Sequence, residues 1–159
     1  MLPDAYARGL AEISLDRLTE MGIRGIIVDL DNTLVAYRAA SVAPMISGWV
    51  TSALARGFRV VLLSNNWSER VATFGSQIGV PSVPNAMKPL PLAFLRALRV
   101  LGTPRSATVV VGDQLFTDVL GAKLLGMHAI LTEPISEHGF VTTRAMRVVE
   151  RALLRWARR

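Results

Sequence analysis

Short apolar runs alternate with amphipathic stretches along most of the chain. The runs are mostly apolar, which predicts buried strands at residues 25–29, 58–63, 107–111 and 128–131, and a weaker pattern indicates a further strand near 80–83. Between them, apolar residues recur every three or four positions, which predicts helices at residues 41–56, 68–78, 89–101 and 115–125, and a shorter helix near 14–21. Continuously apolar strands that are each followed by a helix indicate an α/β fold, in which helices cover both faces of a parallel sheet.

The composition is that of a compact globular domain. The chain has 159 residues, of which 51% are hydrophobic and 19% are charged, and it contains no repeats. We expect a single domain over residues 1–159, with an N-terminal segment at 1–22 and a basic helix at 140–159. The absence of cysteine excludes disulfides and thiolate metal sites and fits a reducing compartment. The chain does not begin with a signal sequence, so we expect a cytoplasmic location.

Two carboxylates at the end of the first predicted strand carry the strongest chemical signal. In an extended chain Asp29 and Asp31 project to the same side, where they repel each other unless a cation lies between them. A calcium-binding loop also begins with this pattern, but it requires Gly and Glu at the positions that Leu34 and Ala40 occupy here. An ordinary polar turn after a strand is the other interpretation of the motif taken by itself.

Polar residues also follow two later strands, and ligands of parallel sheets collect beyond such carboxyl ends. Ser64 follows the second strand, and Asp113 follows the fourth and is joined to Asp118 by the sequence GDQLFTD. Between them Lys88 precedes a proline-marked helix start, and only one other lysine, Lys123, occurs among the 18 basic residues. Taken singly, Ser64 and Lys88 are most simply a polar strand end and a solvated charge. Their occurrence together, in this order, indicates a site.

In chain order these residues resemble the four motifs of the haloacid dehalogenase (HAD) superfamily of phosphohydrolases. With flanks such as GIIVDLDNTLV, SNN, KPLP and VVGDQLFTDVLGAKLLGM, nearly the whole chain is similar to the YqeG-type branch of subfamily IIIA, which is related to phosphatidylglycerophosphate phosphatases. A response-regulator receiver has similar parts, but its acidic pair comes first and its phosphoacceptor follows a later strand. The resemblance implies a three-layer, Rossmann-like sheet with strand order 5-4-1-2-3. The intervals between motifs hold one crossover helix each, so we expect no cap domain and an open site.

The same resemblance implies catalytic or substrate-binding roles for five residues. Asp29 would be the nucleophile that forms an aspartyl-phosphate, and Asp31 would act as general acid and then as general base. Lys88 would bind the phosphoryl group and keep Asp29 ionised. Ser64 and the Asn65 amide would donate hydrogen bonds to the same group.

A magnesium site is implied as well. Its ligands would be Asp29, the main-chain oxygen of Asp31, and Asp113, because Mg²⁺ prefers oxygen ligands and retains several waters. Asp118 is either a further ligand or a residue that orients Lys88 or a bound water.

Arginines line one face of the predicted C-terminal helix, opposite an apolar face, at Arg144, Arg147, Arg151, Arg155 and Arg158. A solvated helix face is the simplest interpretation. Together with the net charge of +6, the arginines also suit peripheral contact with an anionic membrane at its inner face. The chain has no nucleic-acid-binding motif, so we do not expect nucleic acid as a partner. His128 and His138 lack the spacing of metal ligands.

The sequence therefore predicts a Mg²⁺-dependent phosphomonoester hydrolase, and the resemblance favours phosphatidylglycerophosphate, a lipid phosphate, as its substrate. Two alternatives remain open. One is a phosphatase for nucleotides, sugar phosphates or phosphoproteins. The other is a non-catalytic binding module that keeps the fold and uses its basic C-terminal helix, although the intact set of motif residues speaks against it. Nothing in the sequence indicates an oligomeric state.

Overall fold

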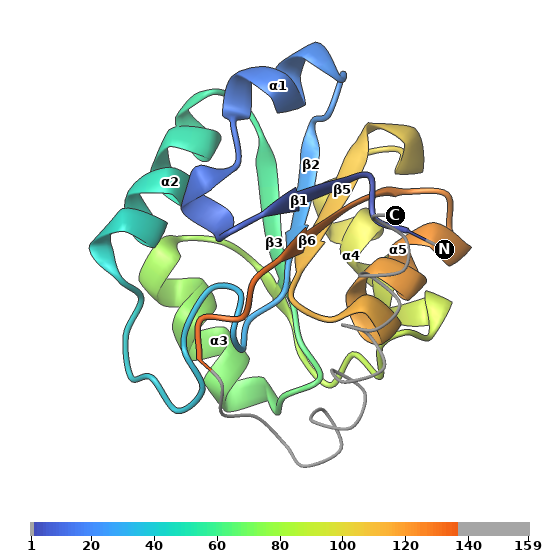
Figure 1. The fold of residues 1–159 in the computed structure, drawn as a ribbon. Helices are drawn as coiled ribbons and strands as arrows, with labels where there is room; N and C mark the ends of the chain where they lie inside the picture. The colour runs from blue at the N-terminus through green and yellow to red at the C-terminus, as the bar shows by residue number, and fades with distance from the viewer. Residues whose placement is uncertain (1, 137–159) are drawn as a thin grey trace, which may run out of the picture.

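Six parallel strands form one sheet at the centre of the structure, a computed structural model in which residues 2–136 are described (Figure 1). The strands are β1 (Ala5–Ala7), β2 (Gly25–Val28), β3 (Arg59–Leu63), β4 (Ser82–Val83), β5 (Thr108–Gly112) and β6 (His128–Thr132). They lie in the order β1-β6-β5-β2-β3-β4. The five strands expected from the sequence are β2 to β6, so the predicted order 5-4-1-2-3 is confirmed.

The edge strand β1 was not predicted. It pairs in parallel with β6 and is anchored by the residue before it. The Asp4 carboxylate accepts hydrogen bonds from the N–H of Ala129 and from the ammonium of Lys123. Burial opposes ionisation of Asp4, but these two donors outweigh it and hold the pKa of Asp4 below its usual value. β1 is therefore fixed to the sheet by backbone pairing and by one charged residue rather than by an apolar run.

Helices cover both faces of the sheet (Figure 1). On one face lie η1 (Leu10–Glu12), α1 (Leu15–Glu20), α2 (Pro44–Ala55) and α3 (Ser68–Ile78), and on the other lie α4 (Pro91–Leu101), η3 (Leu115–Val119) and α5 (Leu120–Leu124). A short turn, η2 (Arg105–Ala107), precedes β5. Only a loop joins β2 to α2, and only α3 separates β3 from β4, so no cap domain is inserted at either place.

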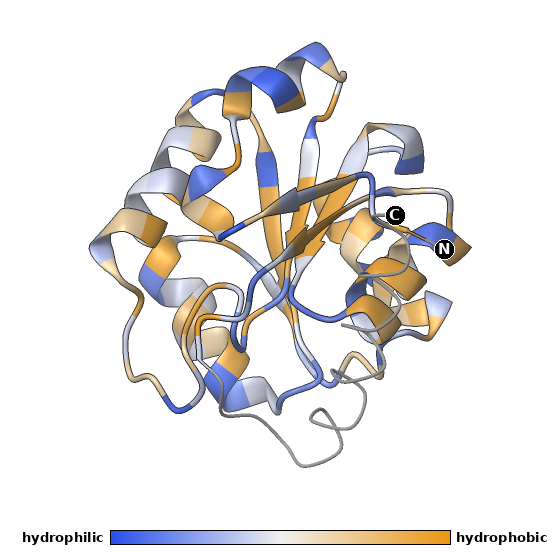
Figure 2. Cartoon of the chain, in the orientation of Figure 1, coloured by the Kyte–Doolittle hydropathy of each residue, from blue (hydrophilic) through white to orange (hydrophobic). Residues whose placement is uncertain are grey.

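Alternate strand residues enter two separate cores. In β2, Ile26 and Val28 belong to the core under α1, α2 and α3, whereas Ile27 belongs to the core under α4 and α5. Figure 2 shows the central strands as hydrophobic along most of their length, with hydrophilic or neutral residues where they begin, as expected for a sheet with both faces covered. This two-sided burial explains why the strands read as continuous apolar runs in the sequence.

Proline and glycine set the ends of several helices. α2 and α4 begin at Pro44 and Pro91, slightly later than predicted. Proline is tolerated there because the first N–H groups of a helix have no partner within the helix. α3 and α4 end at Gly79 and Gly102, which take left-handed backbone angles that glycine adopts without strain. The predicted helix boundaries were therefore right to within a few residues.

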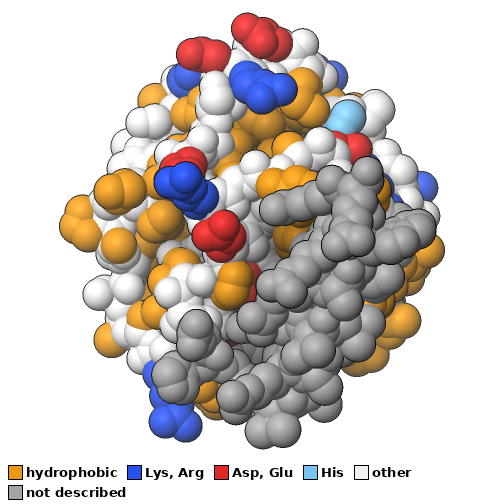
Figure 3. Space-filling model, in the orientation of Figure 1, with side chains coloured by type: hydrophobic (Ala, Val, Ile, Leu, Met, Phe, Trp, Pro, Cys, Tyr) orange, Lys and Arg blue, Asp and Glu red, His pale blue; other side chains and the backbone are white. Residues whose placement is uncertain are grey.

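Helix α2 carries apolar side chains on its outer surface as well as toward the sheet. Trp49 and Val50 are buried, and the indole N–H of Trp49 donates to the carbonyl of Ile13 at 2.9 Å. Met45 and Leu54 are exposed, and Figure 3 shows hydrophobic atoms along this edge of the molecule. Within residues 2–136, α2 and the other helices are too short or too polar to cross a bilayer. The basic helix predicted at 140–159, and His138, lie outside the described residues.

Candidate active site

Three strand ends bring together residues that the sequence analysis singled out. Asp29 directly follows β2, Ser64 follows β3 and Asp113 follows β5, and β2 lies between the other two strands. Their exposed fractions are only 6%, 2% and 4%. The N–H of Asp29 donates to the carbonyl of Val111 at 2.9 Å, which extends the β2–β5 ladder to the site. The predicted rim is thus a buried cluster at the carboxyl ends of the central strands.

Lys88 lies at the centre of this cluster, in the loop between β4 and α4. Its Nζ donates to Oδ1 of Asp29 at 2.5 Å, to Oδ1 of Asp118 at 2.6 Å and to the carbonyl of Leu63 at 3.1 Å. An ammonium has three protons, and here each has an acceptor. Only 4% of the Lys88 side chain is exposed. The lysine is therefore a fixed, desolvated charge beside the first of the motif carboxylates.

Burial and charge oppose each other in this pair. Burial disfavours the ammonium of Lys88, but Asp118 and Asp29 outweigh it and hold the pKa of Lys88 above its ordinary value. Burial raises the pKa of Asp29 to about 7, although the charge of Lys88 opposes the rise. Oδ2 of Asp29 is buried without a hydrogen-bond partner. A cation beside this oxygen would lower the pKa of Asp29 and keep its carboxylate ionised at neutral pH.

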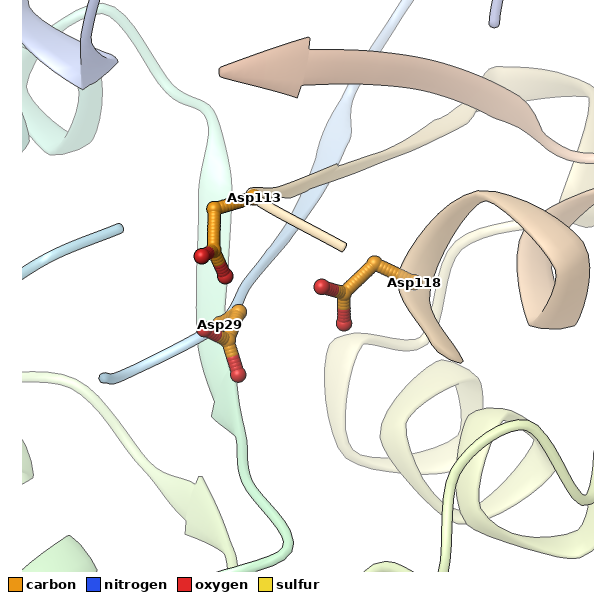
Figure 4. Close-up of side chains that lie close together, drawn as sticks. All are labelled: Asp29, Asp113 and Asp118. Carbon is orange, nitrogen blue, oxygen red and sulfur yellow. The ribbon is translucent and has the colours of Figure 1, made fainter. Parts of the chain in front are cut away.

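Asp113 and Asp118 bring two more carboxylates to Asp29. One oxygen from each of the three lies within 4.8 Å of the others, and all three residues are buried. Figure 4 shows the Asp118 carboxylate pointing toward the other two. Carboxylate oxygens are the ligands that Mg²⁺ and other hard divalent cations prefer. This cluster, with the unpartnered oxygen of Asp29, therefore fits a divalent cation.

The two oxygens of Asp118 are already engaged. Oδ1 accepts from Lys88, and Oδ2 accepts from the N–H of Gln114 at 3.2 Å. Of the two roles that the sequence left open for Asp118, these contacts favour the one that orients Lys88. Gly112 leaves the space that Asp118 needs, because a Cβ built there would lie 2.3 Å from the Cγ of Asp118.

Asp118 also departs from the predicted helix at residues 115–125. It lies in η3, a π-helical turn, and only residues after Val119 continue as α5. The N–H of Val119 reaches back five residues to the carbonyl of Gln114 at 3.3 Å. Such wide turns often occur at functional sites because the extra residue changes the direction of a side chain. The wide turn helps to explain how Asp118 lies beside Lys88.

Ser64 and Asn65 form the loop after β3. The hydroxyl of Ser64 accepts from the N–H of Asn66 at 3.1 Å. Oδ1 of Asn65 accepts from the N–H of Lys88 at 2.7 Å. Asn65 thus joins this loop to the backbone of the buried lysine, a contact that the sequence analysis did not foresee.

Asp31 lies at the edge of the cluster and has two partners that sequence reasoning missed. Nδ2 of Asn66 donates to its Oδ2 at 3.0 Å, and Arg70 of α3 donates to its Oδ1 at 2.9 Å. Asn66 belongs to the SNN fragment, so the sequence could have indicated that it lies near Asp31. Nothing in the sequence distinguishes Arg70 from the other arginines.

Asn32 fixes the turn that follows the first carboxylates. Its φ of 67° is left-handed, a conformation that asparagine tolerates better than most residues. Its Oδ1 accepts from the hydroxyl of Ser136 at 2.5 Å, and its carbonyl accepts from the N–H of Ile135 at 3.0 Å. The segment after β6 is therefore joined to the Asp29–Asp31 loop.

Comparisons with known proteins find relatives among phosphatases. A family model described as HAD-hydrolase-like matches residues 85–134, which include Lys88, Asp113 and Asp118. The chain is 40% identical over 154 residues to the probable phosphatase YqeG of Bacillus subtilis (strain 168), with 96% of this chain and 89% of that protein covered.

More distant relatives also carry the name of phosphatases. The chain is 25% identical over 170 residues to phosphatidylglycerophosphate phosphatase 1, chloroplastic/mitochondrial, of Arabidopsis thaliana, and the match covers 100% of this chain but only 49% of that protein. The chain thus spans about half the length of this relative. Among solved structures, a HAD phosphatase from Thermococcus onnurineus superposes with a TM-score of 0.53 and 25% identity, over 63% of this chain and 50% of that one.

Proposed function

The chain belongs to the YqeG-type phosphatases of the HAD superfamily, and from this premise we propose that it hydrolyses phosphate monoesters through a covalent intermediate on Asp29, with Mg²⁺ as cofactor. One observation carries the proposal. The buried ammonium of Lys88 contacts Oδ1 of Asp29 while Oδ2 of the same carboxylate has no hydrogen-bond partner. A carboxylate held in this way is oriented at one oxygen, and its other oxygen is left for a divalent cation that would keep the nucleophile ionised.

The proposed reaction has two steps. In the first, a carboxylate oxygen of Asp29 attacks phosphorus while Asp31 donates a proton to the leaving oxygen. In the second, Asp31 takes a proton from a water molecule whose oxygen attacks the phosphorus, and inorganic phosphate is released from Asp29. Lys88 and the hydroxyl of Ser64, with the Asn65 amide, would bind the phosphoryl oxygens during both steps.

Mg²⁺ would be held by Asp29, Asp113 and the main-chain oxygen of Asp31. When bound, it would neutralise negative charge on the transferring group. Asp118 would act through Lys88, because both its oxygens are engaged by Lys88 and by the backbone of Gln114. This assignment keeps the number of protein ligands small, as Mg²⁺ generally allows.

For the substrate we propose phosphatidylglycerophosphate. The support is the 25% identity to the Arabidopsis protein that bears this activity in its name, together with the absence of a cap domain after β2 or β3. A site without a cap can accept a phosphate that is displayed on a large surface. The net charge of +6 would favour approach to an anionic membrane from the cytoplasmic side.

The test uses purified full-length protein with a chromogenic aryl phosphate, with and without Mg²⁺. We expect turnover that requires Mg²⁺, that stops on chelation and that is abolished by Asp29→Asn. The Asp31→Asn variant should lose at least about 100-fold in kcat. No turnover in the unaltered protein, under conditions where circular dichroism shows it folded, would reject the enzyme and favour a binding module.

A second assay addresses the substrate. Release of inorganic phosphate would be compared for phosphatidylglycerophosphate in mixed micelles, a nucleoside monophosphate, a sugar phosphate and a phosphopeptide. We expect kcat/KM to be at least about tenfold higher for the lipid than for the other three. A higher value for any water-soluble substrate would reject the lipid while leaving the phosphatase activity intact.

A further inference from the structure

The carboxylate of Asp31 is fixed at both of its oxygens. Arg70 holds Oδ1 at 2.9 Å and Asn66 holds Oδ2 at 3.0 Å. The side chains of Arg70 and Asp31 are 20% and 24% exposed, so the pair is partly shielded from water. A surface carboxylate would ordinarily sample several rotamers, whereas two donors on opposite oxygens define the plane of this one.

Other contacts fix the orientation of the Asn66 amide. Its Oδ1 accepts from the N–H of Trp67 at 2.8 Å, so its Nδ2 is the group that faces Asp31. The backbone of Asn66 is held as well, because its N–H donates to Ser64 Oγ and its carbonyl accepts from the N–H of Asn85. The donor therefore has no freedom to turn away without breaking these bonds.

Arg70 is constrained in the same way. Its second terminal nitrogen donates to the carbonyl of Ala39 at 3.3 Å, and its guanidinium lies 5.0 Å from the ring centroid of Phe74, one turn further along α3. Phe74 is only 2% exposed and so is a firm support. Stacking on an aromatic ring leaves the edges of a guanidinium free to donate, which suits arginine better than lysine.

We propose that Arg70 and Asn66 are positioning residues that align Asp31 for proton transfer to and from the leaving-group side of the phosphoryl group. The inference rests on the proposed function. In the first step the proton on Asp31 moves to the leaving oxygen as the bond from that oxygen to phosphorus breaks and the bond from Asp29 to phosphorus forms. A misaligned Asp31 slows this transfer. Variants of Arg70 and Asn66 should therefore lose most activity on substrates whose leaving oxygen must be protonated.

Leaving-group chemistry provides a selective readout. Dinitrophenolate is stable as an anion and departs without a proton, whereas an alkoxide such as that of glycerol requires one. Loss of alignment at Asp31 should therefore reduce kcat/KM, which reports the first step, much more for an alkyl phosphate than for 2,4-dinitrophenyl phosphate. A general defect in folding or in phosphoryl binding would reduce both alike.

The competing explanation is that Arg70 only attaches the loop at residues 31–43 to α3. Arg70 contacts this loop near both ends, at Asp31 and at Ala39. Gln77, two turns further along α3, also holds the loop, since it accepts from the N–H of Val42 and donates to the carbonyl of Ala40. Gln77 does not contact Asp31, so Gln77→Ala is the matched control for loop attachment.

The experiment measures kcat/KM for glycerol phosphate and for 2,4-dinitrophenyl phosphate, with Mg²⁺, in the parent, Arg70→Gln, Arg70→Lys, Asn66→Ala and Gln77→Ala. This ratio reports the first step, in which the leaving group departs, and not the later hydrolysis of the intermediate that both substrates share. For Arg70→Gln and Asn66→Ala we expect a loss of about 10- to 100-fold with glycerol phosphate and less than about threefold with the dinitrophenyl ester. Arg70→Lys should recover part of the loss, and Gln77→Ala should change both substrates by the same factor. Retained dinitrophenyl turnover also reports that each variant is folded.

Three outcomes would overturn the inference: equal losses with both substrates, no loss with either, or the same selectivity in Gln77→Ala. If Arg70→Gln does not fold, Asn66→Ala decides, because it removes the donor on the opposite oxygen. A parent protein that hydrolyses neither ester would reject the proposed function itself. An active parent with no selective loss in the variants would reject the positioning role alone. An inactive parent would reject the phosphatase activity, so the two failures are distinguishable.

Discussion

The single positive charge of Lys88 serves two buried carboxylates, since its ammonium contacts both Asp29 and Asp118. We expect Lys88→Met to lose at least about 100-fold in kcat, because the phosphoryl charge and the Asp29 carboxylate would then face each other without this cation. The variant should also melt at a lower temperature, since an unpaired charge remains buried. Both effects can be measured by steady-state kinetics and thermal melting of the same samples.

The second lysine provides the matched control. Lys123 pairs with Asp4 at the far edge of the sheet and is partly exposed. Lys123→Met should keep kcat within about twofold of the parent, because partly exposed ion pairs contribute little. A loss in this variant as large as that in Lys88→Met would show that the effect is not specific to the site.

The raised pKa of Asp29 predicts a pH dependence of stability in the metal-free protein. The pKa is about 7 in the folded chain and 3.8 in an unperturbed carboxyl, so between these values the folded state binds the extra proton. Stability contributed by neutral Asp29 is therefore complete below the unfolded value and is lost as the pH rises toward the folded value. In excess chelator, the melting temperature should fall between about pH 4 and about pH 7, and Asp29→Asn should reduce this fall.

Added Mg²⁺ should reverse the destabilisation at the higher pH. A cation present at about 100 times its dissociation constant adds about 3 kcal/mol, which corresponds to a rise of about 5–10 °C in Tm for a chain of this size. Asp113→Asn should show a much smaller rise. An equal rise in the parent and in this variant would place the cation elsewhere.

Some of these residues could be predicted from the sequence, and others could not. Asp29, Ser64 and Asp113 come together because strand ends in a parallel sheet share one rim, which local patterns reveal. The contact between Arg70 and Asp31 joins positions 39 residues apart on a loop and a helix. No local pattern specifies which exposed face of α3 meets that loop, so this partner required the structure.

At the scale of elements, the π-helical turn η3 and the glycine before it together orient Asp118. Gly112→Ala should move the Asp118 carboxylate, because its Cβ would lie 2.3 Å from Cγ of that residue. Since the contact between Asp118 and Lys88 would be strained, we expect a loss of at least about tenfold in kcat. A crystal structure of the variant would show the displacement of the Asp118 carboxylate, and a kinetic assay would measure the loss in kcat.

A second glycine offers the control. Gly48 lies within α2 with nothing within 4 Å of the position that its Cβ would occupy. Gly48→Ala should leave kcat unchanged and raise stability by about 0.5–1 kcal/mol, because alanine favours the helix. If Gly112→Ala behaved like Gly48→Ala, Gly112 would have no part in orienting Asp118.

The apolar pattern predicted strands only where a run of buried apolar residues marks them in the sequence. β2 to β6 were found in this way, although the two-residue β4 is the limiting case. β1 has three residues, of which Ala5 and Tyr6 are exposed, and its attachment depends on the contacts of Asp4. The wide turn in η3 could not be predicted either, because residues 115–125 also fit the spacing of an ordinary helix.

At the scale of the whole molecule, the net charge of +6 predicts an electrostatic association with anionic lipid. The protein should co-sediment with vesicles that contain phosphatidylglycerol at about 0.02 M salt and be released at about 0.5 M, where the Debye length is only a few ångströms. Vesicles of zwitterionic lipid serve as the control. Equal binding to both vesicle types, or binding that salt does not weaken, would contradict an electrostatic origin.

The ends of the sheet have a consequence for how copies of the protein behave in a crowded solution. Among residues 2–136, the outermost strands are β1 and β4, with three and two residues, whereas the strands that they flank have five residues each. Unpaired backbone at a sheet border is a template on which another chain can add a strand, and very short border strands offer it little length. Short border strands therefore disfavour the addition of further strands that would lead to fibres. At one border β1 has this effect because it covers the longer β6.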